Sequence, residues 1–257
     1  MAVPIKLLLT VPPAQLRQVQ TLGLPLGHMA YRIGKGCNLF RCDIPINLRG
    51  GVMVLSDTGF EGSNDCSFLL QQIVRECSTR GFDGIMCDFD QPPTSTLRQI
   101  VARMAEQATR RGWRIYVPLA YAEVSDRTRL LVPSALSGGS LEVRLQELAQ
   151  QYGARRLTLA VDRMSEDFFL PAPSGSGVPL SREALAQRIE QRQPSIFFSR
   201  DLCAHYFTYM SRETGAHFVL FDDSASIRLK FQVANNAGIT DAVLAYPQVD
   251  DILSELL

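Results

Sequence analysis

The stretch Gly81-Phe-Asp-Gly-Ile-Met-Cys-Asp-Phe-Asp90 decides the fold. It begins with the apolar pattern of a buried strand and ends in two carboxylates, Asp88 and Asp90, which Pro92 and Pro93 soon follow. Because side chains alternate between the faces of a strand, the two aspartates share one face with Met86. Two carboxylates on one face of an apolar strand are costly unless water or a ligand contacts them, and the prolines end the strand. The sequence therefore predicts carboxylates at a strand's exit, where barrel enzymes keep their active sites.

Short apolar strands alternate with amphipathic helices along the rest of the chain. This alternation is typical of parallel βαβ units. Eight segments have the strand pattern, and they begin near Ile5, His28, Gly50, Phe82, Trp113, Arg156, His217 and Asp241. A chain of 257 residues has the length of one α/β barrel. The sequence therefore predicts a single (β/α)8 TIM barrel that spans residues 1–257.

A doubly wound open sheet is the alternative fold, but it would place a glycine-rich phosphate loop after the first strand, where the chain reads Val11-Pro12-Pro13.

Two stretches depart from the regular alternation of strands and helices. Residues 166–179 are rich in Pro, Gly and Ser and too long for a simple connector, so we expect a rim or lid loop there. The aromatic segment 195–209 fits two short strands or a hairpin. We expect its rings, and His205 among them, to pack inside a small insertion before the last strands.

Composition excludes several classes of partner. The chain has 26 basic and 26 acidic residues, which gives no electrostatic reason to expect nucleic acid or an anionic membrane as a partner. No apolar run approaches the roughly 20 residues of a membrane span. The first ten residues lack the basic start and the small-residue cleavage site of a signal peptide. We therefore expect neither a membrane span nor a leader.

The cysteines and histidines give no metal-site spacing. The six cysteines form no CxxC pair, and the three histidines are scattered. We expect no metal ion, no cofactor and reduced thiols, as in a protein of the cytosol; a bond between Cys37 and Cys42 would need export to an oxidising compartment.

Around its central strand the sequence resembles glycoside hydrolase family 18, the chitinase-like barrels. The family's fourth strand reads Asp-Gly-x-Asp-x-Asp-x-Glu. Here Asp83-Gly84 match the opening and Asp88 matches the last aspartate, but Met86 stands at the middle aspartate and Asp90 at the glutamate.

The C-terminal part of the chain carries a second portion of this resemblance. Residues 219–231 and 236–246 are similar to the family's closing pattern, in which an aromatic-Asp-Asp strand end precedes a Ser-Ile-x-x-Lys helix and the eighth strand. With Phe207-Thr-Tyr209 before it, this form is most similar to the spore-cortex and spore-germination subgroup. The resemblance spans roughly residue 50 to the C-terminus. Together with the expected reduced thiols and the lack of a recognisable signal peptide, it leads us to expect a cytoplasmic or spore-associated protein.

The resemblance implies hydrolysis in which the substrate's own N-acetyl carbonyl attacks the sugar carbon. Asp90 takes the place of the glutamate that protonates the leaving oxygen, and Asp88 is its partner, able to raise its pKa by like-charge repulsion. Met86 and Val161 occupy the positions of the aspartate and the sixth-strand tyrosine that orient the acetamido group. The side chain of Asp90 is also shorter than glutamate by about 1.5 Å, and a misplacement of about 1 Å can lower a rate roughly a hundredfold.

Other polar and aromatic residues end predicted strands and would meet at the same mouth. The candidate substrate-binding residues are Asp57, Tyr121, Asp162 and Tyr246, and Asp222 also ends a predicted strand. Tyr246 takes the place of the family's eighth-strand tryptophan, which lies under the sugar.

Three functions stay open. The first is an enzyme that binds and hydrolyses N-acetylglucosamine-containing glycans, such as peptidoglycan, spore cortex or chitin. The second is a catalytically inactive barrel that binds a glycan or a protein. The third is a different hydrolase, with a metal ion between Asp88, Asp90 and Asp162.

Overall fold

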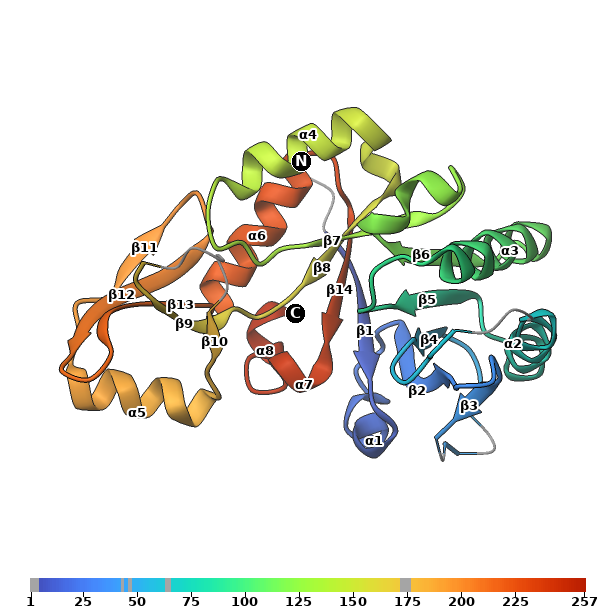
Figure 1. Ribbon diagram of the computed structural model, residues 1–257, viewed down its shortest axis with the longest axis horizontal. Helices are drawn as coiled ribbons and strands as arrows, with labels where there is room; N and C mark the ends of the chain where they lie inside the picture. The colour runs from blue at the N-terminus through green and yellow to red at the C-terminus, as the bar shows by residue number, and fades with distance from the viewer. Residues whose placement is uncertain (1–4, 43, 46–47, 63–65, 172–176) are drawn as a thin grey trace.

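Eight parallel strands close into a barrel in the computed structural model, which describes residues 5–42, 44–45, 48–62, 66–171 and 177–257 (Figure 1). The ring closes because β1 pairs in parallel with both β14 and β2. In order around the barrel the strands are β1 (Lys6–Val11), β14 (Asp241–Ala245), β8 (Leu157–Val161), β7 (Arg129–Pro133), β6 (Arg114–Pro118), β5 (Gly84–Asp88), β4 (Val52–Ser56) and β2 (Leu26–Ile33). The prediction of a (β/α)8 TIM barrel is confirmed.

Helices surround the barrel and bury its outer surface. A capping side chain fixes the start of α3: the Thr94 hydroxyl oxygen accepts a hydrogen bond of 3.2 Å from the backbone N–H of Leu97. The long helices are α2 (Ser67–Arg80), α3 (Ser95–Arg111), α4 (Leu141–Tyr152) and α6 (Ser224–Asn236). The short ones are α1 (Leu16–Val19), α7 (Tyr246–Val249), α8 (Leu253–Leu256) and the 3-10 turns η1 (Pro13–Gln15), η2 (Leu119–Val124) and η3 (Ala154–Arg156).

Inside the barrel, side chains from alternate strand positions form a separate core. Its buried members are Leu8, Val52, Val54, Met86, Tyr116 and Val243. Ile85 and Cys87, the neighbours of Met86 along β5, belong instead to the larger cluster between the strands and the helices. The alternation predicted for the central strand is therefore confirmed, and the position after Met86 on the inner face is Asp88.

One of the eight predicted barrel strands is wrong. The segment that begins near His217 is β13 (Gly215–Phe221), which pairs antiparallel with β9 and β12 outside the barrel. The missing barrel strand is β7, which has only five residues and is joined to β6 through the 3-10 turn η2 rather than through an α-helix. Without a helical pattern before it, this strand had no clear signal in the sequence.

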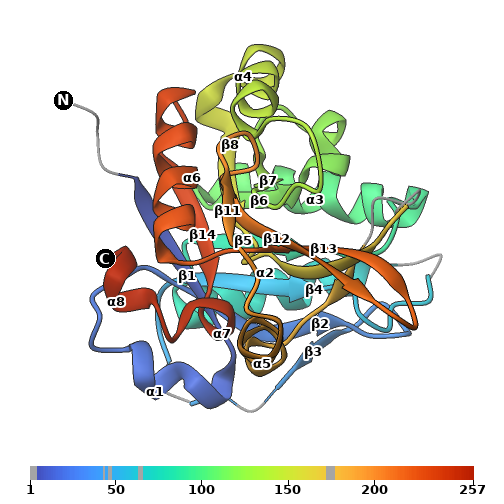
Figure 2. The same cartoon turned by 90° about the vertical axis from the view of Figure 1, so that its left-hand side faces the viewer.

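A second, antiparallel sheet is inserted between β8 and α6. Figures 1 and 2 show it standing beside the barrel with α5 (Arg182–Arg192) against it. Its strands, in order, are β10 (Val178–Pro179), β9 (Ser165–Phe169), β13, β12 (Ala204–Ser211) and β11 (Phe197–Ser199). The expected aromatic insertion is present. The loop expected at 166–179 instead contains most of β9 and all of β10, and residues 172–176 lie outside the described part.

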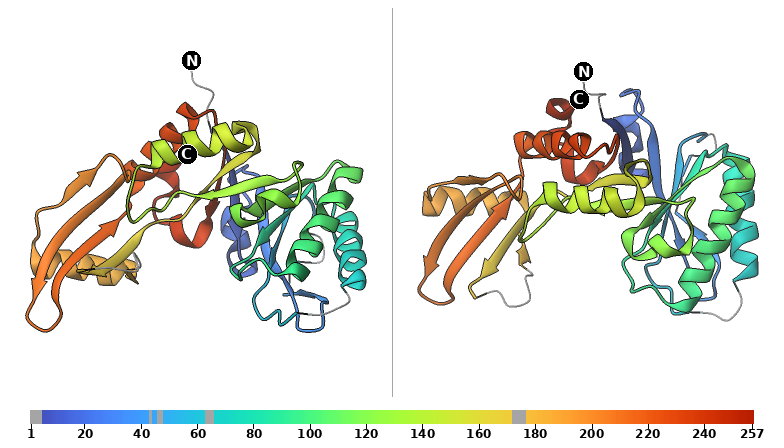
Figure 3. Two further views of the ribbon diagram at one scale, coloured as in Figure 1. Left: turned by 45° about the horizontal axis from the view of Figure 1, so that its top comes forward. Right: turned by 90° about the horizontal axis from the view of Figure 1, so that it is seen from above.

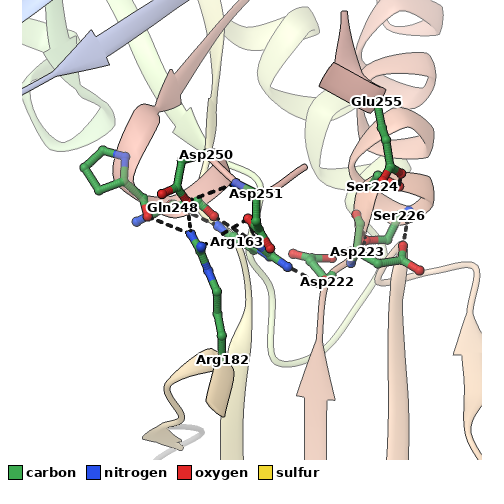
Figure 4. A network of polar contacts seen from close by, with 11 residues as sticks. Arg163, Arg182, Asp222, Asp223, Ser224, Ser226, Gln248, Asp250, Asp251 and Glu255 are labelled. Carbon is green, nitrogen blue, oxygen red and sulfur yellow. Dashed lines mark hydrogen bonds and ion pairs between the residues drawn. The ribbon is translucent and has the colours of Figure 1, made fainter. Parts of the chain in front are cut away.

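Ion pairs join this insertion to the barrel. Arg163, which follows β8, lies 2.6 Å from a carboxylate oxygen of Asp251 and donates to the backbone oxygen of Gln248 at 3.1 Å (Figure 4). Arg182, at the start of α5, lies 2.6 Å from Asp250. The two views of Figure 3 show the insertion leaning away from the barrel beyond this junction.

A disulfide bond joins two loops at the carboxyl ends of the strands. It connects Cys37, in the turn between β2 and β3 (Leu39–Arg41), with Cys66, which precedes α2. The expectation of reduced thiols is wrong for this pair, and Cys42 is a free, exposed cysteine. The two bonded residues are 29 positions apart, so only the fold brings them together.

None of the helices in the described ranges is both long and apolar enough to cross a membrane.

Candidate functional site

Asp88 and Asp90 lie at the carboxyl end of β5 and reach solvent there, and protein atoms surround the carboxyl group of Asp88 on its other sides. Asp88 is the last residue of the strand and continues the inner face on which Met86 is buried. Phe89, between them, is buried on the outer face and packs edge-on against Tyr121, with 5.9 Å between ring centroids. This outer contact holds the strand end in place while the two carboxylates stay at the barrel mouth.

Asp162 meets this pair from the far side of the barrel. It follows β8, and β6 and β7 lie between β8 and β5 in the ring. Burial raises the pKa of Asp88, and the charges of Asp90, Asp57 and Asp162 raise it further. Burial also raises the pKa of Asp162, as does Asp90, while Lys230 acts in the opposite direction. The charge of Asp162 therefore acts on Asp88 although Asp162 follows a strand that is not adjacent to β5.

Asp57, at the end of β4, supports the site from below. Its side chain is 0% exposed, and its two carboxylate oxygens accept hydrogen bonds from the backbone N–H groups of Asp90 at 3.0 Å and Gln91 at 3.1 Å. The Gln91 side chain in turn donates to the backbone oxygens of Asp57 and Phe60. The structure therefore places Asp57 as a clamp on the segment that carries Asp90, with no surface left for a sugar.

Tyr121 does not reach the mouth. It is 1% exposed in η2, within the core between strands and helices, and its hydroxyl group has no hydrogen-bond partner among the described residues. Burial, with a smaller contribution from the charge of Asp57, raises its pKa to about 12. A phenol in this position can support Phe89 but cannot contact a sugar chain at the mouth.

Tyr246 is half-buried at the start of α7, directly after β14. It packs against the outer core cluster rather than the inner one. The inner face of β14 passes through Val243, so the alternation places Ala245, not Tyr246, next on the side of the barrel axis.

The structure bears on two positions drawn from the family resemblance, and it corrects the second. Met86 is 4% exposed and belongs to the core inside the barrel, and Asp88 is the next residue on the same face, at the mouth. Val161 belongs to the seventh barrel strand of the chain, β8, and is buried in the outer cluster. The sixth is β7, which sequence reasoning missed, and it contains neither tyrosine nor aspartate.

The residues Asp222 and Lys230 form a buried ion pair beside the mouth. The Lys230 ammonium group lies 2.5 Å from Asp222, and both side chains are at most 1% exposed. Asp222 also accepts from the backbone N–H of Met164 at 2.8 Å, which fixes the chain just after Asp162. Lys230 was missed as a site residue, although its place eight positions after Asp222, two turns into a helix, was a signal for such a pair.

Two clefts lie near opposite ends of the strands. One, of about 560 Å³, opens between α5 and the turn after β14 and is lined in part by Ser165, Arg182 and Pro247. The other, of about 530 Å³, lies at the amino ends of the strands and is lined in part by His28 and Gly51. No cluster of three or more His, Cys, Asp or Glu side chains that could hold a metal ion occurs in the described ranges. The described groups at the mouth can therefore exchange protons and accept hydrogen bonds without a metal ligand set.

Comparison with solved structures gives strong matches to one kind of enzyme fold. A chitinase from Chromobacterium violaceum superposes with a TM-score of 0.71 and 15% identity over 96% of this chain and 96% of that one. The Bacillus cereus spore cortex-lytic enzyme SleL gives 0.69 and 15%, over 100% of this chain and 75% of that one. A family 18 chitinase from Cycas revoluta, solved with (GlcNAc)3, gives 0.61 and 13%, over 98% of both chains. At these identities the likeness shows a common fold.

No protein-family model matches this chain, and no curated protein sequence matches it.

Proposed function

We propose that this barrel binds and hydrolyses glycans that contain N-acetylglucosamine, such as chitin oligomers or the peptidoglycan of spore cortex. One observation carries the proposal: three solvent-accessible carboxylates, Asp88, Asp90 and Asp162, lie at the carboxyl ends of β5 and β8, and the charges of Asp90 and Asp162 raise the pKa of Asp88. The solved structures that share the fold include chitinases and a cortex-lytic enzyme, which supports this choice of substrate class.

Asp90 is the proposed general acid, with Asp88 as its partner. A general acid needs a carboxyl group that is protonated near the working pH and is held in place. The backbone N–H of Asp90 is held by Asp57, and the raised pKa of Asp88 favours a proton on that neighbouring carboxyl group. In the scheme that the resemblance implies, the substrate's acetamido oxygen is the nucleophile, so the protein must supply only the proton and a partner for the acetamide. Asp88 fits the second task, and Asp162 contacts the sugar from the opposite side.

A catalytically inactive glycan-binding barrel is the second candidate. It is favoured by the short side chain at Asp90 and by the positions of Tyr121 and Tyr246, which pack away from the inner face of the mouth. Binding without turnover would follow if the acid cannot reach the glycosidic oxygen.

Turnover of chito-oligosaccharides and muropeptides by Asp90→Asn separates the two candidates. We expect wild type to cleave at least one of these substrates and the variant to lose at least a hundredfold in rate, the usual contribution of a general acid. Asp83→Asn is the matched control, because Asp83 lies at the amino end of the same strand and pairs with Arg114 at the surface.

Equal cleavage by wild type and Asp90→Asn would remove Asp90 from the mechanism. Binding heat for N-acetylglucosamine oligomers, with no cleavage by any variant, would establish the second candidate. Neither cleavage nor binding by wild type would reject the glycan function altogether.

A further inference from the structure

A cavity of about 320 Å³ lies at the amino ends of the barrel strands, at the opposite end of the barrel from the mouth. We call it the floor cavity. Its polar lining comes from Lys6 on β1, Asp241 on β14, Thr158 on β8 and Arg114 on β6. Four strands of the barrel therefore contribute polar side chains to one small space.

The charged residues of the floor cavity lie on the inner face of the barrel. Lys6, Arg114 and Asp241 each precede by two positions a residue of the inner core on the same strand. Because side chains alternate between the two faces of a strand, the three charged side chains share the inner face, at its amino end. The fold therefore gathers them around the barrel axis.

Thr158 brings an unsatisfied hydroxyl group to this cavity. Its neighbours on β8, Leu157 and Leu159, belong to the outer cluster, so Thr158 faces the barrel axis. Thr158 is 1% exposed, and its hydroxyl group has no hydrogen-bond partner in the part of the chain that the structure describes. The hydroxyl group of Thr10, also buried, instead donates to the backbone oxygen of Leu244 at 3.3 Å. A buried polar group without a partner is unfavourable, so the Thr158 hydroxyl indicates a ligand that completes its hydrogen bond.

The charges around the cavity favour a ligand with one negative charge. The guanidinium group of Arg114 lies 2.6 Å from Asp83, and that of Arg129 lies 3.3 Å from Asp241. Two cations are thus matched by two carboxylates, and Arg114 keeps N–H groups to donate. No carboxylate of the described ranges forms an ion pair with Lys6, which leaves its positive charge in excess.

The rest of the lining fits a short apolar chain. Leu8 and Val243 from the inner core, with Leu24 and Pro25 before β2, line the cavity beside the charged groups. The volume is at the lower end of the roughly 300–1,000 Å³ typical of small-molecule sites. Leu24 and Pro25 also line the cleft beside His28, so the floor cavity adjoins a cleft through which a ligand can enter.

We propose that the floor cavity binds a small monocarboxylic acid with an aliphatic chain. The carboxylate pairs with Lys6 and accepts hydrogen bonds from Thr158 and Arg114, and the chain packs against the apolar lining. This site lies at the other end of the barrel from Asp88 and Asp90, so the proposal holds whether or not the mouth hydrolyses a glycan.

Titration of wild type with hexanoate, followed by the NMR signals of the ligand, tests the proposed site. Hexanamide and inorganic phosphate are the comparison ligands, because the first has a chain of the same length without the charge and the second has charge without the chain. We expect hexanoate to bind at least tenfold more tightly than either, since a charge-assisted hydrogen bond is stronger than a neutral one and phosphate leaves the apolar lining unfilled.

Thr158→Val and Lys6→Gln test the assigned residues, and Thr10→Val is the matched control. Thr158→Val keeps the shape of the side chain and should weaken hexanoate binding about tenfold, without lowering the midpoint of thermal unfolding of the free protein, because the lost hydroxyl had no partner. Lys6 is exposed, so Lys6→Gln should weaken binding about two- to fivefold. Thr10→Val should bind hexanoate as wild type does, because the Thr10 hydroxyl is already bonded to Leu244.

Four results would overturn the inference. Wild type that does not bind hexanoate would reject the site, and equal binding of hexanamide or phosphate would reject the assigned class of ligand. Wild-type affinity in both Thr158→Val and Lys6→Gln would place the ligand elsewhere on the protein, and an equal loss in Thr10→Val would show a general effect on the barrel. The proposed function survives all four, because it is tested by glycan binding and cleavage at the mouth.

Discussion

The ionised carboxylate of Asp88 is less stable in the folded protein than in the unfolded chain. Its pKa is raised above the ordinary 3.8, first by burial and then by the charges of Asp90, Asp57 and Asp162. An acid whose pKa is higher in the folded state binds its proton more tightly there than in the unfolded chain. The free energy of unfolding therefore falls as the pH rises through and above the ordinary pKa. Such a cost is expected where carboxylates are retained for function.

Asp88→Asn should accordingly stabilise the protein at neutral pH. The amide removes the charge that its neighbours repel, so the midpoint of thermal unfolding should rise, and the gain should shrink as the pH falls toward 3.8 and below, where Asp88 is protonated in both states. Thermal unfolding of both proteins over this pH range is the measurement. A variant that is less stable than wild type at neutral pH would show that the carboxylate is favourably paired instead.

Asp57 should be the aspartate on which the local structure depends most. Asp57→Ala leaves the backbone N–H groups of Asp90 and Gln91 without their acceptor in a buried position, which should cost about 3 kcal/mol of unfolding free energy. Asp83→Ala, which breaks an ion pair at the surface, should cost at most about 1 kcal/mol. Denaturant titration measures both, and equal losses in the two variants would contradict the clamp assigned to Asp57.

The sequence predicts the inner face of β5 because alternation within one strand needs no tertiary information. It does not predict that Asp57 and Tyr121, which also follow strands, are buried. Beyond the last ladder bond the chain is free to rotate, and the side chain's direction is then set by partners such as the Asp90 backbone, which are distant in sequence.

Among the structural elements, the loop after β2 and the loop before α2 are held together by the disulfide bond between Cys37 and Cys66. Such bonds persist in oxidising compartments, which makes this pair a feature typical of exported proteins.

Removing this bond should lower stability without changing the fold. Cys37→Ser combined with Cys66→Ser should reduce the free energy of unfolding by about 3 kcal/mol, as expected for a bond that closes a loop of this length. Wild type in reductant should unfold at the same denaturant concentration as the double variant, whereas Cys42→Ser, at a free cysteine, should behave as wild type. No shift of the wild-type midpoint on reduction would contradict the bond.

Elements are predictable from the sequence where a strand is followed by a helix with its own periodicity, as for β5 and α3. Strand β7 lacks that context, since η2 precedes it, and β13 has the apolar pattern of a barrel strand but pairs with a hairpin partner. A short apolar segment does not encode whether its neighbours are parallel or antiparallel, so the count of eight was right while one member was wrong.

At the scale of the whole molecule, the barrel supplies the carboxylates, and the Arg163 and Arg182 contacts join the insertion to it (Figure 4). Asp162 and Met164 lie at this junction, so the insertion borders the barrel mouth.

A crystal structure of Asp90→Asn with N-acetylglucosamine hexasaccharide tests this account most directly. We expect one sugar ring to lie among residues 88, 90 and 162 at the carboxyl ends of β5 and β8. An ordered oligosaccharide in the cleft at the amino ends of the strands, beside His28 and Gly51, with the mouth free of sugar, would contradict it.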